Sequence, residues 1–203
     1  MVIKQQNSLR IFILCAMAVC LNVILGSIVT FTHIPFLFLD ALGTIFISVN
    51  FKMRYGILTG LCTNLLLGVI HGPLALPFGL VSVVIAITAN LCAKNGFTYY
   101  QAIITGVLLV LIGSLASAPI RLLLYGGFGG LQKSVTDLLV FSLRASGKKM
   151  ITAAYWGAVT DGIFDKIISC LLISWINSRS QTQRLLASFY YEGDCNEWPK
   201  ENS

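Results

Sequence analysis

A series of long apolar segments with almost no charge inside them limits the fold of this chain more than any other feature. A helix needs about 17 to 25 mainly apolar residues to cross a bilayer. Six segments approach or reach that length, each bounded by charged residues, Pro or Gly, at 11–32, 36–51, 55–71, 77–93, 100–123 and 160–177. None of them alternates apolar and polar residues as membrane-barrel strands do. The sequence therefore predicts an all-α integral membrane protein, a bundle of six transmembrane helices spanning residues 1–178.

The amino-acid composition agrees with this class. Of 203 residues, 56% are hydrophobic and only 11% are charged, whereas about a quarter of the residues of a soluble domain are charged. Lipid must therefore cover most of the apolar surface. The net charge of +6 is interpreted as topology signals and contact with a membrane surface, so we expect the lipid bilayer as a partner and no nucleic acid.

Basic residues predict the orientation of the bundle. With a cytoplasmic N-terminus, the short inner connections carry Lys52 and Arg54, then Lys94, and the polar tail 179–203 is also cytoplasmic. The short outer turns contain no Lys or Arg, as the positive-inside rule requires. The outer loop 124–152 is the exception, because it holds four basic residues. We expect a multi-pass protein of the plasma membrane with both termini in the cytoplasm.

Five ionisable residues lie inside or at the ends of the predicted spans. They are Asp40, Arg121, Asp161, Asp165 and Lys166. A charge at bilayer depth is costly, so such residues usually face a bundle interior, a partner or a wet cavity. The predicted orientation places all five in the outer half of the membrane, with the last three at the outer end of the span 160–177. This pattern predicts a binding site open to the exterior, and a structural ion pair among the same residues is the alternative.

Other polar and aromatic residues extend the candidate site. Asn64 is a polar group in the middle of a predicted span and needs a hydrogen-bond partner, and His71 lies in a short outer turn. Tyr125 and Trp156 flank the outer loop, either as part of an interfacial aromatic belt or as a surface on which a flat ligand stacks. Small residues recur along the first span at four-residue spacing, which allows another helix to approach closely, whether within the chain or from a separate subunit. These residues are Ala16, Ala18, Cys20, Asn22 and Gly26.

No sequence motif points to chemistry carried out by this chain alone. The glycines of "GGFGG" at 126–130 do not have the spacing of a nucleotide-binding loop, and the six cysteines include no CxxC pair. Cysteines at such spacings are typical of helix packing. We therefore expect no resident cofactor, no metal site and no ATP hydrolysis by the chain itself.

Two stretches together resemble a known family. They are "LFLDALGTIFISVNFKMRYGILTGLCTNLLLGVIHGPLALPFGLVSVVIAITANLCAK" and, after a long gap, "FDKIISCLLISWI". Their order is similar to that in the substrate-binding S components of energy-coupling factor (ECF) transporters, and the resemblance covers most of residues 9–177. It implies a six-helix bundle that captures a vitamin, a related micronutrient or a metal ion from outside. Release would then require toppling in the membrane together with a separate T component and two cytoplasmic ATPases.

The chain departs from that family in two places. Family members usually present Ala-x3-Ala on the first helix to the T component, whereas here Cys20 follows Ala16 and Asn22 follows Ala18. Metal-transporting members have N-terminal ligands, and the first ten residues here contain neither His nor Cys, which argues against a metal cargo. The acidic residues favour a small, polar or partly cationic heterocycle. A membrane sensor module and an intramembrane enzyme using Asp161 and Asp165 are the alternative functions.

Overall fold

The computed structural model describes residues 2–32, 38–125 and 150–191, in which all regular secondary structure is helical. The helices are α1 (Val2–Thr32), α2 (Leu42–Asn50), α3 (Met53–His71), α4 (Phe78–Cys92), α5 (Tyr99–Tyr125), α7 (Met150–Asn177) and α8 (Ser180–Tyr191). Short 3-10 turns, Pro73–Ala75 and Ala93–Asn95, precede and follow α4. The predicted all-α class is confirmed for the described residues.

Within the described ranges, four segments are long and apolar enough to cross a membrane, as in a helical membrane protein. They are Leu9–Val29, Met53–His71, Pro73–Cys92 and Tyr99–Arg121, which match the first, third, fourth and fifth predicted spans. The second predicted span, 36–51, differs, because α2 has only nine residues. A helix of that length extends about 14 Å, less than half of a hydrocarbon core of about 30 Å. The count of six spans stays a prediction.

The last long helix differs from its predicted boundaries. α7 begins at Met150, whereas the predicted span began at 160 and the predicted outer loop extended to 152. Residues 150–159, "MITAAYWGAV", contain no charge and no proline, so nothing in them ends a helix. The predicted polar tail 179–203 also contains regular structure, because its first part forms α8.

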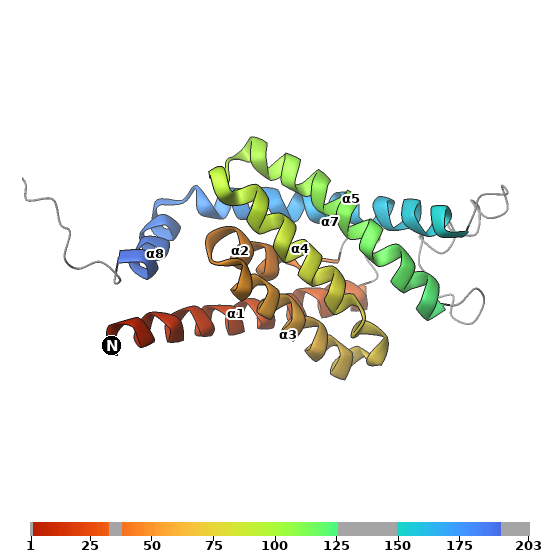
Figure 1. Ribbon diagram of the computed structural model, residues 1–203, viewed down its shortest axis with the longest axis horizontal. Coiled ribbons are helices and arrows are strands. Elements are labelled where there is room, and N and C mark those ends of the chain that lie inside the picture. Colours follow the sequence, from red (N-terminus) through yellow and green to blue (C-terminus); the bar gives the residue numbers. More distant parts are fainter. Residues whose placement is uncertain (1, 33–37, 126–149, 192–203) are drawn as a thin grey trace, which may run out of the picture.

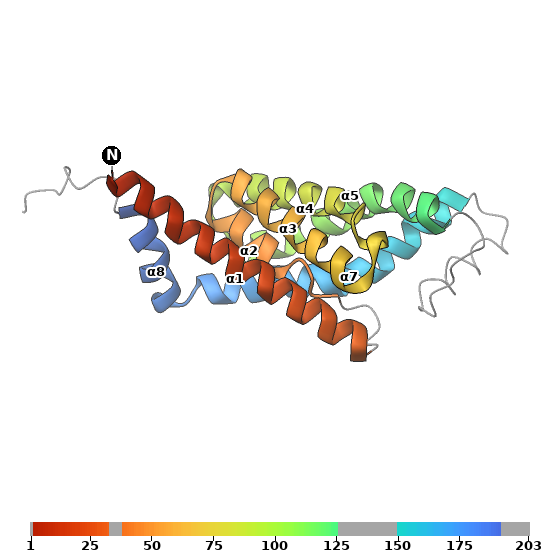
Figure 2. The same ribbon diagram turned by 90° about the horizontal axis from the view of Figure 1, so that it is seen from below.

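The helices pack around the short helix α2 (Figure 1). α5 and α7 lie side by side, and α2 contacts α1, α3, α4 and α7. The start of α1 and α8 lie at one end of the molecule, whereas the end of α5 and the start of α7 lie at the other (Figure 2). α2 is therefore the centre of the bundle although it is too short to span a membrane.

Side chains of α2 fill the centre of two apolar clusters. Ile45 packs with residues of α4, α5 and α7, and Ile47 packs with residues of α1 and the start of α3. Both side chains are fully buried. The last carbonyls of α2 also have a partner, because the amide of Asn90 donates to the carbonyl oxygens of Ser48 at 2.7 Å and Phe51 at 3.0 Å. This contact satisfies groups that a helix end otherwise leaves unbonded.

Helices α2 and α3 approach each other so closely that a glycine is required between them. A Cβ atom added to Gly56 would lie 2.0 Å from Ser48 Oγ and 3.0 Å from Ser48 Cα. The serine is buried and its hydroxyl donates to the Thr44 carbonyl at 2.7 Å, so it has little room to move. By contrast, a Cβ added to Gly113 of α5 would meet its nearest neighbour, Ile85 Cγ1, at 3.9 Å.

We expect Gly56→Ala to destabilise the protein by about 1 to 3 kcal/mol, as overpacking of a filled core usually does. Gly113→Ala is the matched control, and we expect it to be neutral or to stabilise by about 0.5 to 1 kcal/mol, because alanine favours a helix interior. Thermal unfolding of the two purified variants in detergent measures both effects. Equal midpoints would contradict the close packing of α2 against α3.

Candidate functional site

The carboxylate of Asp165 lies in the interior of the bundle and is bonded through both of its oxygens. Its side chain is only 1% exposed. Oδ1 accepts hydrogen bonds from two successive backbone amides, those of Phe38 at 3.1 Å and Leu39 at 2.7 Å. Oδ2 forms an ion pair with the ammonium of Lys166. Asp165 therefore joins α7 to the segment that leads into α2.

The backbone at Leu39 is shaped for this contact. Its φ angle is +52°, and it is the one non-glycine residue with positive φ among the described residues. The left-handed conformation costs roughly 1 to 2 kcal/mol for a residue with a side chain. Successive amides that point the same way form an anion-binding concavity. The bonds to Asp165 offset the cost of the turn and hold it in place.

Asp40 approaches the same ammonium from the other side. Its Oδ1 atom lies 3.9 Å from Lys166 Nζ, beyond hydrogen-bond distance, and its side chain is 40% exposed. The Asp40 side chain also packs against α1, where a Cβ added to Gly26 would lie 3.2 Å from the Asp40 Cβ. The group of Asp40, Asp165 and Lys166, which we call the charge cluster, thus combines α7, the start of α2 and a glycine of α1.

The charge cluster lies farther from the start of its helix than the sequence predicted. Residue 165 is in the middle of α7, because the helix begins at Met150 and not near 160. The next residues along α7 pack on α5, where a Cβ added to Gly106 would lie 3.0 Å from Ile167 Cα. Gly106 is inside the candidate span Tyr99–Arg121. Asp165 and Lys166 therefore do not lie at the start of their helix, and their depth in a membrane stays a prediction.

Asn22 forms a second buried polar group, which links three helices. Its amide nitrogen donates to the hydroxyls of Thr44 and Thr63, each at 3.0 Å, and its Oδ1 accepts from the Gly43 amide at 2.6 Å. The side chain is fully buried. The full burial of Asn22 and its three bonds to α2 and α3 support intramolecular packing among the two roles considered for this residue.

The other small residues of α1 divide between two faces. Ala18 and Gly26 face the bundle with Asn22 and are buried. Ala16 and Cys20 are exposed, on a face that also presents Ile13, Met17 and Ile24. The Ala18–Asn22–Gly26 series therefore packs inside the chain, and the Ala16–Cys20 series remains on the outer surface.

Asn64 and His71, both on α3, are bonded to neighbouring helices. The Asn64 amide donates to Ser82 Oγ at 2.7 Å and to the Gly60 carbonyl at 3.0 Å, so it fastens α3 to α4. His71 Nε2 lies 3.1 Å from Ser27 Oγ of α1, next to the glycine on which Asp40 packs. His71 is exposed and therefore open to solutes at this end of α3.

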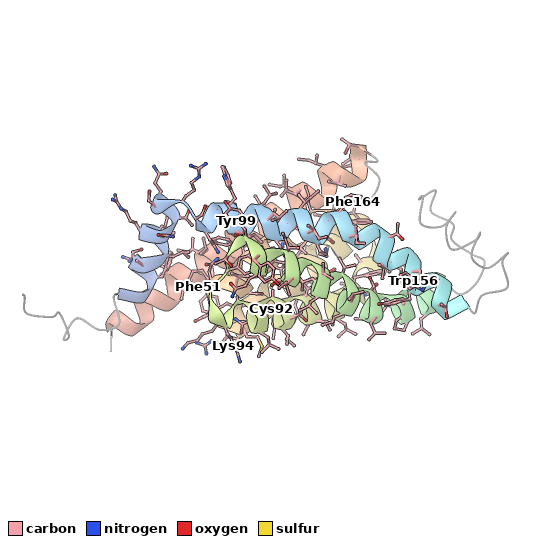
Figure 3. The ribbon with its side chains drawn as sticks, turned by 90° about the horizontal axis from the view of Figure 1, so that it is seen from above. Phe51, Cys92, Lys94, Tyr99, Trp156 and Phe164 are labelled. Atoms are coloured by element: carbon pink, nitrogen blue, oxygen red, sulfur yellow. The ribbon has the colours of Figure 1, made fainter. Side chains whose placement is uncertain are left out.

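The remaining candidate residues lie on α5 and α7. Arg121 is half-buried near the end of α5, and Trp156 is 55% exposed with its ring 5.7 Å from that of Tyr155. Figure 3 shows Trp156 toward the end of the molecule opposite α8. Tyr125 ends α5 and Asp161 lies one helical turn before Asp165, but their side chains are outside the described part of the structure. The ring contact of Trp156 is with Tyr155 and not with the charge cluster.

Sequence reasoning missed the two backbone amides that bind Asp165, and it did not see that Asn22 holds three helices together. An asparagine inside an apolar span is a usable signal for such a link, because its amide needs partners, and here Gly43 and Thr44 in the first turn of α2 provide them. Neighbouring amides carry no such signal. Within the described residues, no three His, Cys, Asp or Glu side chains gather in a way that could hold a metal ion.

Comparisons with known proteins find no counterpart. No protein family, curated protein or solved structure matches this chain.

Proposed function

We propose that this chain is the substrate-capture subunit of an ECF-type importer for a vitamin or related small micronutrient. It would act in the plasma membrane with both termini in the cytoplasm, and deliver its cargo through a separate T component and two ATPases. The resemblance of its sequence to S components supports this proposal. So does a charge cluster placed inside apolar helices, because ionisable groups at such positions usually serve a ligand or an ion path.

The observation that carries the proposal is the contrast between the two carboxylates of the charge cluster. Asp165 is buried and bonded through both oxygens. Asp40 is 40% exposed and stands 3.9 Å from Lys166. Because a partly exposed carboxylate at this position can accept further hydrogen bonds, Asp40 is the residue best placed to bind cargo, while Asp165 and Lys166 position it.

The charges of the cluster indicate the chemistry of the cargo. Two carboxylates face one ammonium, so a small polar or partly cationic heterocycle would complete the charge balance. His71, near Ser27 on the adjacent helix face, can add a hydrogen bond. Trp156 is exposed and offers a ring for stacking. Asn64, Arg121, Tyr125 and Asp161 complete the set of proposed contacts.

The exposed face of α1 is the proposed contact with the T component. Ala16 and Cys20 are small and exposed, so a partner helix can approach the α1 backbone there. Asn22 and Gly26 would support this face from inside, because they fix α1 against α2 and α3.

The bonds of Asp165 also bear on the two alternative functions, an intramembrane enzyme and a membrane sensor module. A catalytic pair formed with Asp161 would need a carboxylate able to exchange protons or attack a substrate. Asp165 is already bonded to two amides and an ammonium, which counts against that role. A membrane sensor function gains no specific support from these contacts.

Substitution of Asp40 tests the binding site directly. We expect one member of a panel of vitamins and their precursors to raise the thermal midpoint of the purified protein, because a ligand that binds the native state stabilises it. Asp40→Asn should weaken that ligand by about tenfold to a hundredfold, the contribution of a charge-assisted hydrogen bond. Titrations followed by thermal shift measure the affinity.

Lys94→Gln, in the α4–α5 connection and away from the charge cluster, is the control. This variant should bind the ligand with the affinity of the unmodified chain. Two results would overturn the proposal. In one, no compound in the panel stabilises the chain; in the other, the ligand binds Asp40→Asn with unchanged affinity. Copurification with a T component and its ATPases tests the partner proposal separately.

A further inference from the structure

Exposed basic side chains gather at the end of the molecule that carries the start of α1 and α8. They come from α1, the α2–α3 and α4–α5 connections, the α7–α8 connection and α8 itself. We call this set the terminal basic face: Arg10, Lys52, Arg54, Lys94, Arg179 and Arg184. Figure 3 shows Lys94 and Tyr99 toward this end and Trp156 toward the other.

Negative charge is placed elsewhere in the described residues. The acidic residues among them are Asp40, Asp161 and Asp165, none of which belongs to this end of the molecule. Among the described residues, the terminal basic face therefore carries charge of one sign. Such a surface attracts anions over roughly a Debye length, about 8 Å at physiological salt.

Helix α8 gives this end the form of a membrane-surface helix. Leu186 and Phe189 pack on the apolar cluster that contains Ile47 and Phe51, and the Phe51 and Phe189 rings meet edge to face at 5.6 Å. Arg184 is exposed, and Leu185, which is also exposed, leaves an apolar side chain beside the packed face. The packed side of α8 thus faces the protein, and its exposed side, with Arg184, Leu185 and polar residues, is available to lie in the plane of a membrane interface.

Exposed aromatic side chains lie next to the basic residues at this end of the molecule. Trp175 is 49% exposed and carries the guanidinium of Arg179 4.5 Å above its ring. Tyr99 and Tyr100 are also exposed, and the Tyr99 hydroxyl lies 3.5 Å from Ser178 Oγ, next to Arg179. Trp and Tyr concentrate at the headgroup level of membranes. The stacked arginine therefore lies next to the side chains that are typical of the headgroup level.

We propose that the terminal basic face binds the headgroups of anionic phospholipids, with α8 lying along the membrane surface. Arginine pairs with phosphate through two parallel hydrogen bonds, so Arg179 and Arg184 are the residues expected to contact it most directly. The positive face and an anionic leaflet are complementary in charge, and the exposed Leu185 can enter the boundary of the acyl chains. This binding does not depend on the proposed transport function.

Titration of the full-length protein in neutral detergent with phosphatidylglycerol tests the proposal, and phosphatidylcholine is the neutral comparison. Phosphatidylglycerol should raise the thermal midpoint and phosphatidylcholine should not. In Arg179→Gln/Arg184→Gln, the half-saturating concentration of phosphatidylglycerol should rise about fivefold for each arginine removed. Arg179→Lys/Arg184→Lys keeps the charges and should lose less, while Gln183→Ala on α8 should respond as the unmodified chain does.

The same titration separates a lipid surface from a soluble anion. Inorganic phosphate at equal concentration should neither stabilise the chain nor compete with the lipid, and the lipid effect should shrink in high salt. Equal stabilisation by the two lipids would overturn the proposal. So would an unchanged half-saturating concentration in the double glutamine variant, or stabilisation by phosphate alone.

Discussion

Replacing Asp165 with alanine is expected to lower the free energy of unfolding by about 3 to 5 kcal/mol, the usual cost of leaving a buried charge without its partner. The substitution would leave the ammonium of Lys166 facing only Asp40, 3.9 Å away. It would also remove the acceptor for the amides of Phe38 and Leu39. Chemical or thermal unfolding of the purified protein in detergent measures the loss.

Asp40→Ala is the matched control for this experiment. Asp40 is 40% exposed and lies beyond hydrogen-bond distance of Lys166, so we expect its removal to cost less than about 1 kcal/mol. The double variant Asp165→Leu/Lys166→Met should recover the part of the loss that comes from the unpaired ammonium, because an apolar pair needs no partner, while the amides of Phe38 and Leu39 stay without their acceptor. Equal losses of unfolding free energy in Asp165→Ala and Asp40→Ala would contradict a stabilising role for the bonds from the Phe38 and Leu39 amides to Asp165.

Replacing Asn22 with leucine should destabilise the bundle by about 3 kcal/mol, mainly because the Gly43 amide would stay buried without an acceptor. Gly43 is packed closely against α1, since a Cβ at that position would lie 2.5 Å from the Ala18 carbonyl oxygen. The hydroxyl of Thr63 keeps its bond to the Thr59 carbonyl, so it adds little to the loss. The unfolding measurement is the same as for Asp165.

Cys20→Ala on the same helix is the control for Asn22. Cys20 is exposed, and exposed substitutions usually change stability by less than about 0.5 kcal/mol. A small effect of Asn22→Leu, comparable to that of Cys20→Ala, would contradict the role of Asn22 in holding α1 against α2 and α3.

Much of the fold follows from hydropathy, because long apolar runs have few alternatives to a helix in lipid. The first, third, fourth and fifth predicted spans correspond to the four segments that are long and apolar enough to cross a membrane. The second predicted span could not be placed from hydropathy. Its segment 36–51 is mostly apolar, but only Leu42–Asn50 is helical among its described residues, since the bonds of Asp165 hold the preceding residues in a turn.

The candidate site could likewise be predicted from the sequence only in part. An aspartate next to a lysine in an apolar helix is visible in the sequence, and so is Asp40 near a Gly-Thr pair. Which carboxylate is satisfied by the protein and which is exposed is not visible, because the two backbone amides that donate to Asp165 belong to residues more than a hundred positions earlier in the chain.

The sequence alone determined that this chain is helical and apolar, and which few ionisable residues occur in its apolar segments, because hydropathy and charge are properties of each segment separately. Tertiary structure alone decided that α2 is a short central helix, that Asn22 is an internal link, and that Asp165 binds the backbone while Asp40 stays exposed. The reason is physical. Hydrogen bonds and burial depend on which distant segments meet, and packing around α2 brings Gly26, Asp40 and Lys166 together.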